Sequence, residues 1–249
     1  MRHSRTTARA RLRLHRAVAT ASVLQALRPG VYALSISNVY GGTFRCMSKV
    51  AAQLQGLEVT FLDFDKASDT EVVSAVRENT KASVPCTFSE FRPRADAAHT
   101  QLVWIETPMN STLRLPDLPC VTALLQRTFP PAMQPLVLVD AMLLSPFYIS
   151  PLAAPVHADI ALHSLTKYIN GHSDVLMGMV VLPAGPHADV LHTRLRARVR
   201  AECARCGARR VRRVACIARG EDAHAMHARA RAQHDASHVC SGAASTWQR

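Results

Sequence analysis

Residues 160–174 read IALHSLTKYINGHSD and place a lysine, Lys167, between a short apolar strand and a glycine turn. A lysine is costly to bury as a cation, so a lysine in a tight turn at a strand end indicates a chemical role. A desolvated lysine becomes an amine nucleophile that can form an imine with an aldehyde cofactor. The alternative is an ordinary exposed loop lysine, which is the usual state of this residue type.

Short apolar strands alternate with helical segments through the rest of the chain. We expect strands at residues 31–36, 58–64, 102–105, 136–140, 160–162 and 179–182, and helices at 18–27, 44–55, 68–79 and 117–129. Such an alternation predicts an α/β fold whose mostly parallel sheet is covered on both faces. Active-site residues of parallel sheets collect at the carboxyl ends of the strands. Asn110, Asp140 and Lys167 each follow a predicted strand, so we expect them at one edge of the sheet.

Charge is distributed unevenly along the 249 residues, although the formal net charge is +12. Residues 1–57 hold nine lysines and arginines and no acidic residue, and residues 194–249 have an excess of nine basic residues. Residues 58–193 carry six more acidic than basic residues, as an ordinary metabolic domain would. The basic ends could bind nucleic acid through its phosphates. They lack stacking aromatic residues, so such binding is expected to be non-specific and ranks last among the functions considered.

Composition divides the chain into three parts. We expect an Arg-rich N-terminal extension at residues 1–16, an α/β domain at 17–195 with an inserted loop at 81–100, and an Arg/Ala/His-rich degenerate tail at 196–249. The N-terminal stretch has the composition of an organelle transit peptide. A helix with distant acidic partners and a misassigned start remain alternatives to targeting.

Seven cysteines at irregular spacing, without a secretory apolar segment, favour a reducing compartment, which we take to be the cytoplasm. No run of about 18 apolar residues occurs, so no membrane partner is expected. The tail holds a group of thiols and imidazoles, Cys203, Cys206, Cys216, His224 and His227. Their spacing fits no compact zinc module, so no metal site is predicted.

Four motifs occur together in this sequence. The lysine motif, residues 164–175, resembles the cofactor-lysine signature of the cystathionine lyase and synthase family, which are Cys/Met-metabolism enzymes that use pyridoxal phosphate (PLP). Residues 39–43 (VYGGT), 104–112 (WIETPMNST) and 139–140 (VD), the last followed by a Ser-Pro pair, resemble three further blocks of that family in the same order. The resemblance covers about residues 17–195. It implies the large domain of a PLP-dependent transferase of the aspartate aminotransferase type, fold type I.

The resemblance also implies roles for individual residues. Lys167 matches the lysine that forms the imine with the cofactor and then moves protons on the substrate. Asp140 matches the carboxylate that holds the proton of the pyridine nitrogen. Tyr40 matches the tyrosine that stacks on the ring and assists protonation of the leaving group. Asn110 matches the asparagine that donates a hydrogen bond to the phenolic oxygen of the cofactor.

The phosphate site is matched only in part. Ser164 and Thr166 match the hydroxyls that bind the phosphate in the family. The family also cradles the phosphate in a glycine turn at a helix start. Here the corresponding residues 15–19 read HRAVA and lack the glycine. The family's N-terminal arm, its Asn-Thr pair after the aspartate, and its small C-terminal domain with the arginine that binds the substrate carboxylate are missing from this sequence.

Three functions follow from this comparison of motifs. The first is a PLP-dependent carbon–sulfur lyase of transsulfuration, most like the γ-lyases, which acts on cystathionine or a related sulfur amino acid and forms a homo-oligomer. The second is a catalytically inactive, truncated copy that keeps a cofactor-binding core or serves as partner of a longer subunit. The third is the basic, non-specific nucleic-acid-binding protein.

Overall fold

The structure is a computed structural model. It describes residues 10–14, 16–27, 29–76, 102–131, 133–172, 178–184 and 186–205.

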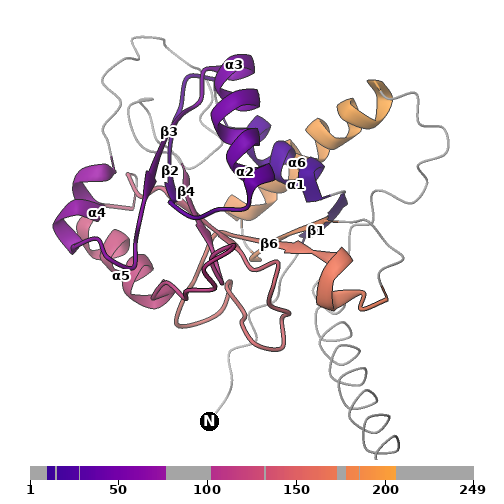
Figure 1. The fold of residues 1–249 in the computed structure, drawn as a ribbon. Helices are drawn as coiled ribbons and strands as arrows, with labels where there is room; N and C mark the ends of the chain where they lie inside the picture. Colours follow the sequence, from indigo (N-terminus) through magenta and orange to yellow (C-terminus); the bar gives the residue numbers. More distant parts are fainter. Residues whose placement is uncertain are drawn as a thin grey trace, which may run out of the picture.

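One sheet organises the described part of the chain (Figure 1). Its seven strands are β1 (Ala10–Leu14), β2 (Tyr32–Ile36), β3 (Glu58–Leu62), β4 (Leu102–Glu106), β5 (Leu136–Asp140), β6 (Ile160–Ser164) and β7 (Gly178–Leu182). They lie in the order β1-β7-β6-β5-β4-β2-β3. The five strands from β6 to β3 are parallel to one another, whereas β7 is antiparallel to both of its neighbours. The prediction of a mostly parallel α/β sheet is therefore confirmed, with β7 as the exception.

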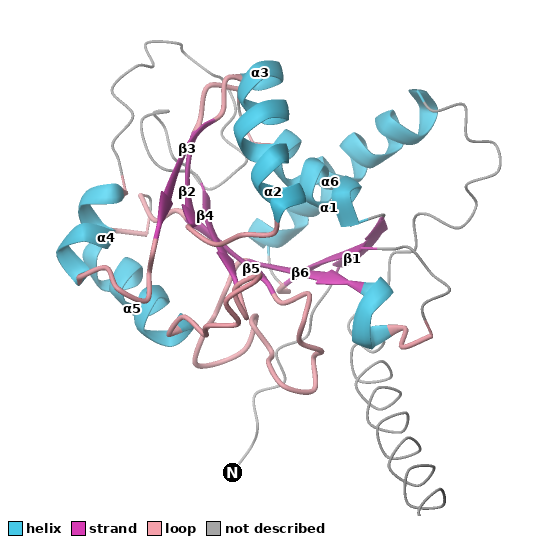
Figure 2. Cartoon of the chain, in the orientation of Figure 1, coloured by secondary structure: helices cyan, strands magenta, loops and turns pink. Residues whose placement is uncertain are grey.

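Helices cover both faces of this sheet (Figure 2). The helical segments are α1 (Arg16–Ala26), α2 (Gly41–Arg45), the π-helix η1 (Cys46–Ala51), α3 (Ala52–Gln55), α4 (Asp69–Ala75), α5 (Leu118–Thr128), the π-helix η2 (Leu165–Ile169) and α6 (Pro186–Arg205). Buried residues of α1, η1 and α6 pack on one face. Buried residues of α4 and α5 pack on the other. The central strands are apolar along their length because both of their faces are buried.

Several helix ends follow from local sequence. Ser68 and Glu71 form a capping box at the start of α4, because the Ser68 hydroxyl accepts from the Glu71 amide and the Glu71 carboxylate accepts from the Ser68 amide. The helix expected at residues 44–55 begins earlier, at Gly41, and includes the π-helical turn η1. It ends at Gly56, whose φ of 66° lies in the left-handed region that glycine favours.

Two described elements cross the domain boundaries that composition predicts. Strand β1 lies within the expected N-terminal extension and pairs along its full length with β7. Helix α6 runs through residue 195 and ends at Arg205. The sheet and its covering helices therefore reach further toward both ends than composition indicated, because the basic residues of these segments do not prevent pairing and helix formation. The inserted loop expected at 81–100 lies outside the described residues.

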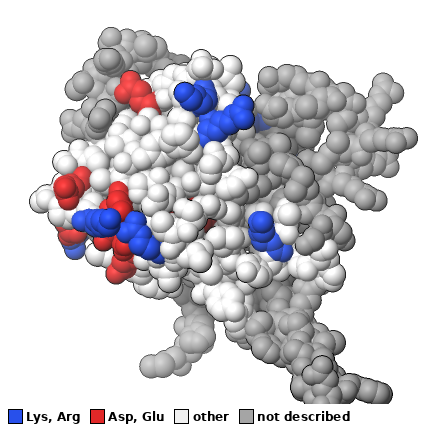
Figure 3. Space-filling view, in the orientation of Figure 1, with Lys and Arg blue, Asp and Glu red and all other residues white. Residues whose placement is uncertain are grey.

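The surface of the described part carries charges of both signs (Figure 3). Arg114 forms ion pairs of 2.9 Å with Asp63 and with Asp65, and Arg127 pairs with Asp69. Large parts of the two basic ends, residues 1–9 and 206–249, lie outside the described residues, so the nucleic-acid hypothesis stays a prediction. Within the described ranges, no helix is long and apolar enough to cross a membrane. The same ranges contain no cluster of three potential metal-ligating side chains.

Candidate active site

Polar residues end the neighbouring strands β4, β5 and β6. Glu106, the last residue of β4, pairs in register with Asp140, the last residue of β5. Asp140 also pairs with Leu162 of β6, two residues before Ser164. Because these three strands are parallel, the chain brings Glu106, Asp140 and Ser164 to one edge of the sheet. Lys167 follows Ser164 by three residues.

The three strand-end side chains share one face of the sheet and are buried. Leu138 and Leu162, two residues before Asp140 and Ser164, belong to the core on the α1 side of the sheet. Side chains two residues apart on a strand point to the same face, so Asp140 and Ser164 also point to that side. Glu106 and Asp140 are 0% exposed and Ser164 is 3% exposed. The sequence thus places two carboxylates inside the core at adjacent positions.

Lys167 lies in the turn η2, directly after β6. Its backbone angles, φ −89° and ψ −130°, are non-helical and interrupt the turn. The side chain is exposed, which corrects the expectation of a desolvated lysine. The turn carries Lys167 past the end of the sheet, and the described residues leave it open to solvent. Only a group bound at this edge, or chain beyond the described residues, would desolvate the amine.

The start of helix α1 lies at the same edge. Leu14, the last residue of β1, pairs with Gly178, and Gly178 pairs with Ser164. Helix α1 begins at Arg16, directly beyond Leu14. A helix N-terminus favours an anion because its first amides are not bonded within the helix. The family glycine is absent here, but the helix start is kept beside Ser164 and the half-buried Thr166.

Tyr40 is the N-cap residue of α2, and 43% of its surface is exposed. Its backbone amide donates a hydrogen bond of 2.7 Å to the Glu106 carboxylate, and its carbonyl accepts from the Phe44 amide at 2.9 Å. The ring lies over Gly42, where an added Cβ would come within 2.4 Å of the Tyr40 Cε1 atom. Glu106 therefore joins the Tyr-Gly-Gly-Thr turn to the sheet, a role that the sequence motifs did not reveal.

Asn110 is half-buried and lies in the loop that follows β4. The loop is closed by two backbone hydrogen bonds of 2.9 Å, from the Met109 amide to the Arg114 carbonyl and from the Leu113 amide to the Met109 carbonyl. The guanidinium of Arg114 also binds Asp63, and this contact lowers the pKa of the Asp63 carboxyl below its usual range. The loop that carries Asn110 is thereby held to the segment after β3.

His163 is a second buried polar residue that the sequence motifs did not mark. It lies in β6 next to Ser164 and is 3% exposed. Burial lowers the pKa of its imidazole to about 4, and a backbone hydrogen bond with Ala141 partly opposes this effect. The imidazole is therefore neutral at pH 7. Its position inside a continuously apolar strand was the one sequence signal for a buried histidine.

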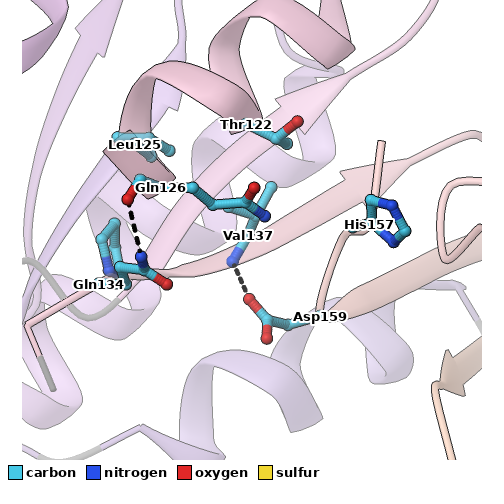
Figure 4. A pocket seen from close by; sticks show the side chains of 8 residues that line it. Thr122, Leu125, Gln126, Gln134, Val137, His157 and Asp159 are labelled. Atoms are coloured by element: carbon cyan, nitrogen blue, oxygen red, sulfur yellow. Dashed lines mark hydrogen bonds between the residues drawn. The ribbon is translucent and has the colours of Figure 1, made fainter. Parts of the chain in front are cut away.

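A small polar cavity lies at the amino ends of β5 and β6, away from the carboxyl ends that carry the candidate site (Figure 4). It measures about 60 Å³ and is bordered by Gln126, Gln134, His157 and Asp159, among others. The Asp159 carboxylate accepts from the Val137 amide at 2.9 Å. These residues lie before or at the starts of β5 and β6, so the cavity belongs to the end of the sheet away from Lys167.

Comparisons with known proteins identify the family. The family model for "Cys/Met metabolism PLP-dependent enzyme" matches residues 83–198, which include the Asn110 loop, Asp140 and Lys167. This part of the chain is similar to the enzymes of that family. Cystathionine gamma-lyase of Saccharomyces cerevisiae is 39% identical over 161 residues, which are 65% of this chain and 34% of the relative. The Sus scrofa enzyme of that name is 34% identical over 178 residues, 72% of this chain and 36% of the relative. The Bacillus subtilis enzyme of that name is 34% identical over 174 residues, which are 70% of this chain and 38% of the relative.

The resemblance seen in the four motifs is thus confirmed, and with it the fold class and pyridoxal 5′-phosphate as cofactor. The chain spans about a third of the length of these curated relatives. The types of group at the carboxyl ends of these strands fit the cofactor, because a lysine amine, a buried carboxyl, two hydroxyls and a helix N-terminus all lie at this end of the sheet. The tail at residues 196–249, for which no metal site was predicted, lies outside the described residues from residue 206 onward.

Proposed function

We propose that the chain is the cofactor-binding part of a PLP-dependent carbon–sulfur lyase of the cystathionine gamma-lyase type. The observation that carries this proposal is the order of groups along one sheet edge. The buried Asp140 ends β5, and Lys167 follows the adjacent parallel strand β6. A carboxylate for the ring nitrogen and an amine for the aldehyde thereby come from neighbouring strands. The names of the relatives support cystathionine or a related sulfur amino acid as substrate.

Each residue has a defined task in this proposal. The cofactor, once bound, supplies an electron sink for carbanions of an amino acid. Asp140 keeps a proton at the ring nitrogen, since a buried carboxylate retains a positive neighbour strongly. Lys167 would hold the cofactor through its aldehyde, with loss of water, and would move protons on the substrate. Tyr40 would face the ring and give a proton to the leaving sulfur. Asn110 donates to the phenolic oxygen.

Phosphate binding is assigned to the region around β6 and α1. Ser164 and Thr166 offer hydroxyl donors, and the start of α1 offers backbone amides at the same edge. Assembly into a homo-oligomer and location in the cytoplasm belong to the same proposal. The homo-oligomer rests on the family resemblance of the motifs, and the cytoplasmic location rests on the cysteine composition.

A second candidate is a copy that binds cofactor without turnover, alone or as partner of a longer subunit. One observation favours it, namely that Lys167 and Tyr40 are both exposed in the described part of the chain. A site that needs further residues to exclude water would bind the cofactor but process substrate slowly.

Absorbance spectroscopy of the purified chain with added pyridoxal phosphate separates these candidates. We expect a visible band from lysine-bound cofactor, and we expect Lys167→Ala to abolish it. Lys167→Arg is the matched control, because it keeps the positive charge but cannot form the bond to the cofactor. If the band depends on that bond and not on the charge, this variant should lose the band as well. Release of cysteine from cystathionine, with a fall of about 10²–10⁴-fold in Lys167→Ala, supports the lyase. A band without cysteine release favours the second candidate, and the absence of a band contradicts both.

A further inference from the structure

Glu106 is the feature that the proposed roles leave without a function. Its carboxylate is fully buried at the end of β4 and accepts the amide hydrogen of Tyr40, a residue 66 positions earlier in the chain. The distance of 2.7 Å is typical of a strong hydrogen bond with a charged acceptor. Burial of a carboxylate costs several kcal/mol, and an apolar side chain would fill the same space at lower cost. Core packing alone therefore does not account for a glutamate at this position.

The start of helix α2 explains what the carboxylate does. Tyr40 is the N-cap of α2, its side chain makes no capping hydrogen bond, and the first turn holds no acidic residue. By contrast, α4 is capped locally, by Ser68 and by Glu71 three residues later. Glu106 provides from a distant strand the hydrogen-bond acceptor that α4 obtains from Glu71 in its own first turn.

The position of Glu106 beside Asp140 gives this long-range cap a second consequence. The two residues are register partners on adjacent strands, so their side chains emerge side by side on the same face. One carboxylate faces the place of the ring nitrogen, and its neighbour holds the turn that carries the aromatic ring. The sheet register thereby couples the location of Tyr40 to that of Asp140.

We infer that Glu106 is a positioning residue that fixes Tyr40 over the cofactor site by binding its backbone amide. The inference rests on the proposed function for the identity of the cofactor. The tether itself does not depend on that function. Glu106 touches neither substrate nor cofactor in this assignment and acts through Tyr40.

Amide hydrogen exchange on the full chain without cofactor tests the tether. Glu106→Leu keeps a side chain of similar volume but removes the hydrogen-bond acceptor. In this variant we expect exchange of the Tyr40 amide hydrogen to accelerate by about tenfold or more. Glu106→Gln keeps an acceptor oxygen and should stay within a few-fold of the wild type. Val103→Ala, on the opposite face of the same strand, is the control for general weakening of the core. Equal exchange at Tyr40 in wild type and Glu106→Leu overturns the tether.

A double-mutant cycle on cofactor affinity tests the positioning role. Glu106→Leu should weaken binding of pyridoxal phosphate about tenfold when Tyr40 is present, and less than about twofold in a Tyr40→Ala background. Equal losses in both backgrounds would show that Glu106 acts through the fold and not through Tyr40. If Glu106→Leu fails to fold, Glu106→Met supplies a more flexible apolar variant for both measurements. Failure of the wild type to bind the cofactor contradicts the proposed function, while the exchange result still decides the tether.

Discussion

The buried and the exposed halves of the candidate site are held in different ways. Glu106, Asp140 and Ser164 end strands of the sheet and are almost completely buried. Tyr40 and Lys167 lie on turns beyond the strands and are exposed. The first group is placed by strand register and core packing, whereas the second depends on a few contacts of the turns. In the proposed function, the residue that holds a fixed charge, Asp140, is therefore part of the core. The residues that move protons, Lys167 and Tyr40, lie on the turns.

The largest expected effect tests the buried half through His163. The pKa of this imidazole is lowered from 6.5 to about 4, so the unfolded chain binds more protons than the folded chain between these values. Stability from this residue is complete above pH 6.5 and is lost as the pH falls toward 4, by about 3 kcal/mol. Urea unfolding of the wild type and of His163→Asn over this range should show a loss that is about 3 kcal/mol smaller in the variant.

His172→Asn is the matched control for that measurement, because His172 is an exposed imidazole of the other half. The same measurement on this variant shows what the loss of an exposed imidazole alone does to the unfolding free energy. If His163→Asn follows the wild-type curve, the buried half does not contain a histidine that is kept neutral by burial.

A second prediction concerns the charge of Asp140. Asp140→Asn keeps the volume of the side chain but removes the charge, and a hydrogen bond to a charged group contributes about 1.5–3 kcal/mol. We expect binding of pyridoxal phosphate to weaken by roughly 10–100-fold, measured by absorbance titration. Ser164→Ala, at the same edge but without a charge, should weaken binding less. An unchanged affinity in Asp140→Asn would place the ring nitrogen elsewhere.

The smallest expected effect tests the exposed half. In Gly42→Ala the new Cβ would overlap the Tyr40 ring, so the ring has to shift. Alanine favours a helix over glycine by up to about 1 kcal/mol, so the protein should not lose stability. Cofactor affinity should fall, by less than about tenfold, as the ring leaves its position.

Gly41→Ala separates the two effects of that substitution. An added Cβ at Gly41 meets no atom within 4 Å, so this variant gains helix propensity without moving Tyr40. Its cofactor affinity should equal that of the wild type while its melting temperature rises. Equal affinities for Gly41→Ala and Gly42→Ala would mean that the ring position does not affect the cofactor.

Sequence patterns predicted the parts of this structure that depend on local signals. The apolar strands gave the parallel sheet, and the Ser68–Glu71 spacing gave the start of α4. Asn110, Asp140 and Lys167 were expected at strand ends because chemistry-bearing residues follow apolar runs there. The family motifs then added Tyr40, Ser164 and Thr166, which periodicity alone would not mark.

Other features depend on pairings between distant segments and could not be predicted. The bond from the Tyr40 amide to Glu106 joins residues 66 apart, and no local pattern encodes it. Strand β1 was missed because its alternating arginines resemble a basic extension, yet a strand at the edge of a sheet tolerates such residues. The sequence left the exposure of Lys167 open between two alternatives, since desolvation depends on what covers a turn and not on its sequence.

The pairing of β1 with β7 has a consequence for biosynthesis. Among the strands of the described sheet, residues 10–14 are synthesised before the others, and their partner residues 178–182 are synthesised last. At about 5–20 residues per second, β1 remains without its partner for roughly ten to thirty seconds. During this time the nascent chain exposes a strand whose hydrogen-bonding groups could pair with another chain. The sequence of β1 carries Arg11 and Arg13, and like charges of this kind disfavour pairing of an exposed strand with a second copy of itself.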